Sequence, residues 1–210
     1  MVPSTDVNWQ GLSSHRSFSD RDATVLSLVD EEALSTFTFD GLKRRLGLHP
    51  ETLSRILSRL EEEGIVKKTR EGYEVTPKIA KLKSGPEQIE EQTSSLLQTF
   101  LPSNMQIRNL ISELKGRWFG VLRWFGMSET REGVMLKWIT EDGGIQIAAS
   151  ISGTFLNIDA KFLKSNNLDL ALKAAYQLMA CIGKLCNTTR TATHVAYHPS
   201  TNSNSYFILT

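Results

Sequence analysis

The chain of 210 residues carries a net charge of only +1, with 40% apolar and 22% charged residues. These proportions are those of a folded globular protein and exclude a disordered or uniformly basic chain, so any binding to nucleic acid must depend on local charge separation. Cys181 and Cys186 are the only cysteines and are not spaced as CxxC, which argues against a disulfide framework or a zinc site. Neither a signal peptide nor an apolar run of about 18 residues is found, so we expect a cytoplasmic protein without membrane contact.

The first third of the chain has the pattern of three helices followed by a hairpin. Residues 1–18 are polar and unpatterned and are expected to form a flexible leader. Ser19 or Asp20 is a helix N-cap, Gly47 ends a second helix, and Pro50 and Gly64 bound a third. The alternating segments IVKKT and YEVT surround a short turn at residues 70–72, and a short basic helix is expected over 77–84.

A different composition begins at residue 85. Residues 86–101 and 103–116 are both expected to be helices, which form a linker or dimerisation region over 85–116. From Arg117 the apolar period changes to two, and four strands are expected over 117–125, 133–140, 144–151 and 153–160. An apolar helix at about 167–186 and a hairpin of 192–198 with 205–210 complete a C-terminal α+β domain over 117–210.

The third helix separates two kinds of side chain. Leu53, Ile56, Leu57 and Leu60 recur at the spacing of a core-facing stripe. The other side carries hydroxyl and arginine side chains, and such a face can contact base edges in the major groove of duplex DNA. Basic residues precede and follow the helix, so we predict a DNA-binding surface made of Lys43, Arg44, Arg45, Thr52, Ser54, Arg55, Ser58, Arg59, Lys67, Lys68 and Arg70.

The run FTFDGLKRRLGLHPETLSRILSRLEEEGIVKKTREGYEVTPK resembles the winged helix-turn-helix of prokaryotic transcription regulators of the MarR, ArsR and Lrp kinds, over about residues 20–84. The resemblance implies that the third helix enters the major groove, and that Lys67, Lys68 and Arg70 form a wing on the DNA backbone. It also implies a homodimer, because paired helices must meet half-sites about one DNA turn apart. The expected fold is α+β: an N-terminal winged helix-turn-helix over 19–84, joined by helices to a C-terminal domain of antiparallel sheet and helix.

These residues also have a simpler interpretation. Lysines and arginines on a helix are commonly just solvated, and some winged helices dock other proteins instead of DNA. The wing turn is short and contains the acid Glu71, which argues against deep insertion into the minor groove. A DNA-binding transcription regulator is the leading hypothesis, and a module for protein–protein interaction is the alternative.

The C-terminal domain offers fewer candidate residues. Trp118, Trp124 and Trp138 form a candidate pocket for an unknown small-molecule effector, with ordinary core packing as the simpler interpretation. The homodimer is expected to form through residues 86–115 or through the apolar helix. His194 and His198 are too few to define a metal site. No catalytic motif is present, so we expect no enzyme activity, no cofactor and no metal.

Overall fold

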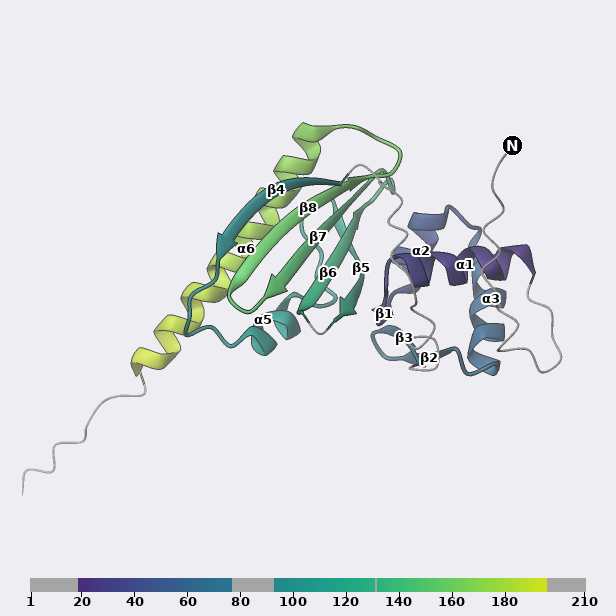
Figure 1. Cartoon of the computed structure of the whole chain (residues 1–210), viewed down its shortest axis with the longest axis horizontal. Coiled ribbons are helices and arrows are strands. Elements are labelled where there is room, and N and C mark those ends of the chain that lie inside the picture. The colour runs from purple at the N-terminus through teal and green to yellow at the C-terminus, as the bar shows by residue number, and fades with distance from the viewer. Residues whose placement is uncertain (1–18, 77–92, 131, 196–210) are drawn as a thin grey trace, which may run out of the picture.

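The computed structural model describes residues 19–76, 93–130 and 132–195, with side chains as far as residue 187. Its described strands form one antiparallel sheet of eight, in the order β2-β3-β1-β5-β6-β7-β8-β4 (Figure 1). The N-terminal elements are α1 (Asp20–Glu31), β1 (Thr36–Phe37), α2 (Phe39–Leu46), α3 (Pro50–Glu62), β2 (Val66–Thr69) and β3 (Gly72–Val75). The remaining elements are β4 (Thr93–Phe100), α5 (Ile107–Leu114), β5 (Leu122–Glu129), β6 (Val134–Thr140), β7 (Ile145–Ser152), β8 (Phe155–Phe162) and α6 (Leu168–Val195).

The three N-terminal helices and the hairpin are confirmed, and local chemistry explains their limits. Ser19 caps α1 in a reciprocal capping box with Asp22. Gly47 ends α2 in a left-handed conformation with φ of 65° that an L side chain adopts only with strain. Pro50 occupies the first turn of α3, where its missing N–H costs nothing.

The expected fold class is wrong, because the hairpin is not the wing of a separate domain. The two-residue strand β1 pairs with β3 on one side and with β5 on the other. Thr36 therefore lies opposite both Glu74 and Met127. On the β5 side the two backbones approach so closely that a Cβ on Gly126 would lie 2.3 Å from the Thr36 oxygen. The N-terminal hairpin and the C-terminal strands are consequently parts of one sheet, and no pair of helices separates them as the sequence predicted.

The helix expected at 86–101 is also wrong over its described part. Residues 93–100 form the strand β4, which pairs with β8. This segment is rich in serine and threonine, whose hydroxyl groups and branching disfavour a helix interior, and Pro102 follows it. Pairing with β8 then decides the conformation, which local apolar spacing alone could not reveal.

The other C-terminal elements follow the sequence closely, with two changes. Helix α5 and strands β6, β7 and β8 are confirmed, whereas β5 begins only at Leu122 because residues 119–122 form a tight turn. Residues 192–195 belong to α6 instead of the expected hairpin. The leader at 1–18, the basic helix at 77–84 and the last strand at 205–210 lie outside the described residues.

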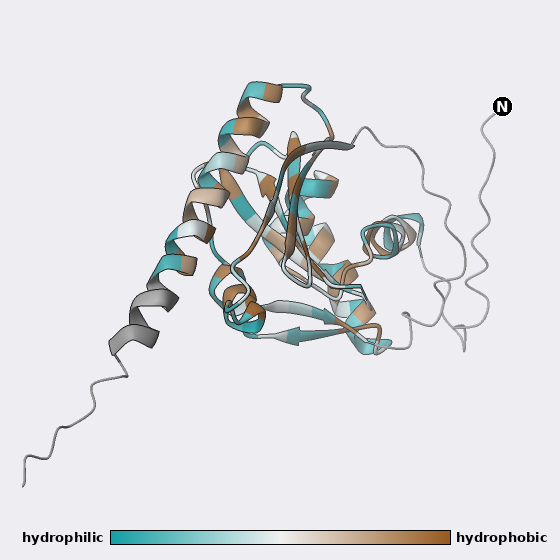
Figure 2. Cartoon of the chain, turned by 60° about the vertical axis from the view of Figure 1, so that its left-hand side comes forward, coloured by the Kyte–Doolittle hydropathy of each residue, from teal (hydrophilic) through white to brown (hydrophobic). Residues whose placement is uncertain are grey.

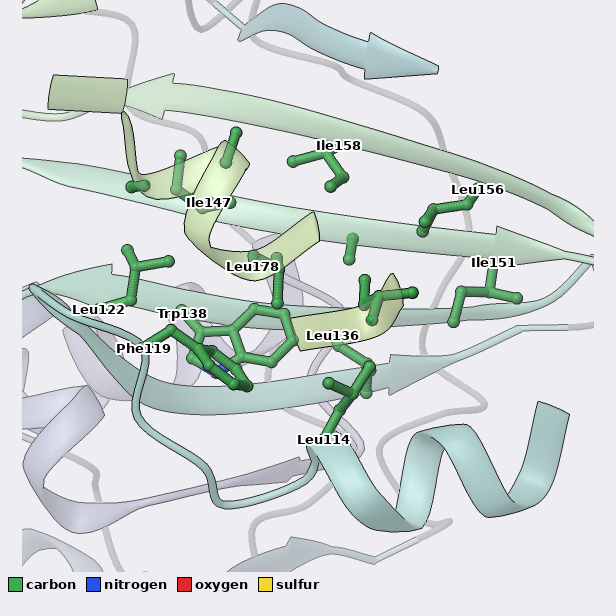
Figure 3. Close-up of a cluster of buried hydrophobic side chains, with 14 of the residues drawn as sticks. Leu114, Phe119, Leu122, Leu136, Trp138, Ile147, Ile151, Leu156, Ile158 and Leu178 are labelled. Carbon is green, nitrogen blue, oxygen red and sulfur yellow. The ribbon is translucent and has the colours of Figure 1, made fainter. Parts of the chain in front are cut away.

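Two apolar clusters cover opposite faces of the sheet. The larger lies between the sheet and α5 and α6, with Trp138 and Leu178 in its middle and Leu114 at the side of α5 (Figure 3). Along α6, hydrophobic and hydrophilic residues follow one another within the turns of the helix (Figure 2). The second cluster lies among α1, α2 and α3 and includes Phe125 and Ile139 from the sheet. Within the described parts of the chain, no helix is both long and apolar enough to cross a bilayer.

Candidate nucleic-acid interface

Helix α3 buries one side completely and exposes the other. Its four apolar residues are at most 1% exposed and anchor it to the second cluster: Leu53, Ile56, Leu57 and Leu60. Ser54, Arg55, Ser58 and Arg59 are exposed on the outer side, and Thr52 is half-buried at its margin. The predicted division of this helix is therefore confirmed, and a rigid helix presents these polar side chains.

Arg55 is held only by a neighbour on the same helix. Its Nη2 lies 2.6 Å from Oε1 of Glu51, and both side chains are largely exposed. Such a pair, four residues apart on an exposed helix, contributes only about 0.3–0.5 kcal/mol. Arg55 can therefore exchange Glu51 for another acceptor at little cost.

Arg59 is held differently, because its partner is buried. Its Nη2 donates to Oδ1 of Asp22 at 2.5 Å, and the Asp22 side chain is only 3% exposed. Burial alone would raise the pKa of Asp22, but the hydrogen bonds from Arg59 and Ser19 outweigh burial and lower that pKa below its ordinary value. Arg59 therefore ties α3 to α1 and is the least suited of the exposed group to contact a ligand.

The three basic residues of α2 do not share one surface. Lys43 Nζ forms an ion pair at 2.9 Å with Asp40 near the surface. Arg44 lines a pocket beside the hairpin, whereas the Arg45 side chain is only 15% exposed and faces the buried Glu32. Of the cluster predicted at 43–45, Arg45 therefore points away from any surface that duplex DNA could reach.

The hairpin supplies exposed cations, but its turn is tied to the body of the molecule. Lys67, Lys68 and Arg70 are exposed. The carboxylate of Glu71, in the turn, lies 2.8 Å from Nζ of Lys115 at the end of α5. This ion pair is partly exposed and weak, but β3 also pairs with β1, so the turn does not project as an independent wing.

Local charge around α3 is mixed. Residues 19–76 contain nine lysines and arginines and twelve acids, including Glu61, Glu62 and Glu63 at the end of α3. The exposed positive charge nearest to α3 thus comes from Arg55 and from the hairpin residues Lys67, Lys68 and Arg70, with acids on either side. A polyanion would be attracted at that strip alone and repelled around it.

The three tryptophans do not form one pocket. Trp138 is fully buried, and its Nε1 donates to the Arg117 carbonyl oxygen at 2.9 Å. Trp124 packs edge-on against Trp138 with ring centroids 5.2 Å apart, whereas Trp118 is 63% exposed beneath the Arg123 guanidinium. Trp138 therefore belongs to the core, as the simpler interpretation held.

Two adjoining pockets lie between the hairpin, the end of α5 and the start of β5. Their volumes are about 430 and 320 Å³, and both are lined by Glu71, Lys115 and Trp124. Trp118 lines the smaller one. Glu71 and Lys115, which form an ion pair, line both pockets, so a ligand that filled both would contact these two charges.

A buried charge cluster escaped the sequence analysis. Glu32, at the end of α1, accepts hydrogen bonds from Lys137 on β6, Gln146 on β7 and Lys161 on β8, at 2.6, 2.9 and 2.8 Å. Burial would raise the pKa of Glu32, but Lys137 and these hydrogen bonds lower it to about 2. Burial also lowers the pKa of Lys137, although the Glu32 charge opposes that shift. The available signal was a single lysine inside the apolar strand VMLKWIT.

Nothing in the structure adds to the case for a metal. The described residues contain no group of three or more metal-ligating side chains. His194 lies in the last turn of α6, and His198 lies outside the described residues.

Comparison with protein-family models, with curated proteins and with solved structures found no match to this chain.

Proposed function

We propose that this chain binds double-stranded DNA through the outer face of α3 and regulates transcription. The observation that supports this most is the exposure of Ser54, Arg55 and Ser58 on a helix anchored by four fully buried residues. An α-helix fits the major groove, the arginine fork matches the two acceptors of guanine, and serine is short enough not to hold the helix away.

The lysines of β2 would supply the contacts that do not depend on sequence. Lys67 and Lys68 are exposed on the strand that follows α3, and the backbone N–H of Lys68 donates to Glu61 at the end of that helix. Phosphate contacts fix register and orientation, while base contacts select the site. The acids at 61–63 would keep the far end of α3 away from the phosphates.

A small-molecule effector would have a physical route to this interface. A ligand in the pockets beside Trp124 would compete with the ion pair of Glu71 and Lys115, which ties the hairpin turn to α5. Release of this turn would alter the position of β2 and its lysines. Such a ligand would regulate DNA binding, which α3 would carry out without it.

Fluorescence anisotropy with labelled duplexes selected from a random pool tests the proposal. We expect Arg55→Ala to weaken binding to the selected site by about 1–3 kcal/mol, which is roughly 5- to 150-fold. Arg108→Ala, an exposed arginine on α5, makes the same change in net charge away from α3 and should leave the affinity nearly unchanged. Failure of the wild-type chain to bind any duplex at low salt, or equal losses in both variants, would refute DNA binding by α3.

The excess of acids over bases in residues 19–76 favours a second candidate function, the docking of a protein with a basic surface. Binding of such a partner would not show the steep decrease with salt that release of counterions from DNA produces. Loss of partner binding in Glu62→Lys but not in Arg55→Ala would favour this candidate.

A further inference from the structure

The two edges of the sheet differ in a way that bears on assembly. Edge strand β2 has four residues, two of which are Lys67 and Lys68. Edge strand β4 has eight residues, TSSLLQTF, with no charge and no proline. Natural proteins block edges with short strands and lysines, because an open edge pairs with other strands. Among the strands that the structure describes, one edge is therefore short and charged, whereas the other is long and uncharged and is interrupted only by a β-bulge between Ser95 and Leu97.

The side chains of β4 suit close pairing. Thr93, Ser95, Gln98 and Phe100 are exposed, and the ring of Phe100 is 74% exposed even though it contacts Phe155 edge-on. An antiparallel pair of two β4 strands would place only uncharged side chains opposite each other. The same pairing of two β2 strands would bring lysines together, which is unfavourable.

Helix α6 lies next to β4 and adds apolar side chains beside this edge strand. It packs over β4 and β7. On one flank Gln177 lies against Gly120, so close that a Cβ there would be 2.1 Å from Oε1, which places that flank toward β5. With 100° of rotation per residue, Leu172 and Met179 lie on the other flank, toward β4, and both are only half-buried. Apolar side chains of α6 therefore lie beside β4, the uncharged edge strand of the described sheet.

We infer that two copies of this chain associate about a two-fold axis through antiparallel pairing of their β4 strands. The pairing joins the two sheets into one and brings the Leu172–Met179 flanks of the two α6 helices together. Strand pairing supplies hydrogen bonds between backbones, and the helices supply the apolar area that a stable interface of about 800 Å² per partner needs. The inference is independent of DNA binding, because it concerns the free protein.

Sedimentation velocity of the full chain, without DNA, tests this interface. The wild-type chain should sediment as a dimer at micromolar concentration. The double variant Ser95→Lys/Gln98→Lys adds charge to exposed positions of β4 and should sediment as a monomer with an unchanged circular dichroism spectrum. The control, Thr69→Lys/Ser112→Lys, adds the same charge to the β2 edge and to the exposed side of α5, and should remain dimeric.

A second variant examines the helix layer separately. Met179→Glu should raise the dimer dissociation constant at least tenfold, since it places like charges in the apolar contact between the two helices. A monomeric wild-type chain would overturn the inference, and so would a β4 double variant that stays dimeric. Dissociation of the Thr69→Lys/Ser112→Lys control would overturn it too, by placing the interface elsewhere.

Discussion

The Nζ atom of Lys137 lies 2.6 Å from Oε2 of Glu32, although the two residues are 105 positions apart and both are about 4% exposed. Lys137 also donates to the backbone oxygen of Glu32, which accepts a further bond from Ser128. The end of α1 is thus fastened to the face of the sheet opposite α6. This contact is one reason why the N-terminal helices and the C-terminal strands form one structure.

Glu32→Gln should strongly destabilise the fold. The substitution keeps the shape but leaves Lys137 and Lys161 without the carboxylate that both contact, and breaking a buried ion pair costs about 3–5 kcal/mol. Urea denaturation measures the free energy of unfolding. Glu31→Gln is the matched control, since Glu31 is 43% exposed and lies 3.5 Å from Lys161, so its loss should cost less than about 1 kcal/mol. Equal costs for both variants would contradict a structural role for the buried cluster.

Stability should fall in acid for the same reason. The pKa of Glu32 is about 2 in the folded chain and about 4.5 in the unfolded chain, so the unfolded state binds the proton first as the pH falls. The contribution of Glu32 is complete above pH 4.5 and should be lost progressively between pH 4.5 and 2. Denaturation curves at pH 7, 5, 4 and 3 measure this slope. Glu32→Gln should have a shallower slope, with the remainder from groups such as Asp22, and an unchanged slope would refute this assignment.

Replacement of the two exposed arginines of α3 should change the stability of the fold by very different amounts. Arg59→Ala leaves the buried Asp22 without its charged donor and should cost about 1.5–3 kcal/mol of stability. Arg55→Ala loses only an exposed pair with Glu51 and should change stability by less than about 0.5 kcal/mol. Thermal unfolding separates the two. Similar melting temperatures for both variants would show that Arg59 is not a structural tether.

Gly41→Ala should destabilise the chain even though alanine is the better helix former. A Cβ at position 41 would lie 2.7 Å from Cα of Phe125 and 2.8 Å from its Cδ2, so α2 could not approach β5 as it does. Such overpacking costs about 1–3 kcal/mol, more than the gain of about 1 kcal/mol in helix propensity. Ser112→Ala, on the exposed side of α5, should be neutral or slightly stabilising. A gain of stability in Gly41→Ala would contradict this close approach.

Lys68→Ala should weaken binding to every duplex to a similar extent. If Lys68 contacts a phosphate, its loss should reduce the slope of log K against log salt by about 0.9. Anisotropy titrations at several salt concentrations measure this slope. Because Lys68 also protects the β2 edge, a variant that binds DNA normally but self-associates would assign the lysine to edge protection alone.

Elements specified by neighbouring residues were predictable. Ser19, Gly47 and Pro50 mark helix limits through contacts within a few residues, and the period of two in VMLKWIT and GIQIAASI follows from the alternation of faces along a strand. The polar face of α3 was predictable in the same way, because its buried and exposed sides are set by helical spacing alone.

Features that depend on distant residues were not predictable. β1 has only two residues and is a strand because Thr36 meets β3 and β5 together. The roles of Arg59 and Arg45 depend on Asp22 and Glu32, which belong to another helix. No local sequence pattern indicates which residue a charged side chain contacts in the folded chain.

Helix α3 and strand β4 lie at opposite ends of the molecule (Figure 1). Any pair of copies joined at β4 therefore carries its two α3 helices outward, at the far ends of the assembly. Such a dimer cannot place its two α3 helices in adjacent turns of one duplex, as a compact two-fold regulator does. It would instead tether two separate stretches of DNA, either closing a loop within one molecule or holding two molecules together.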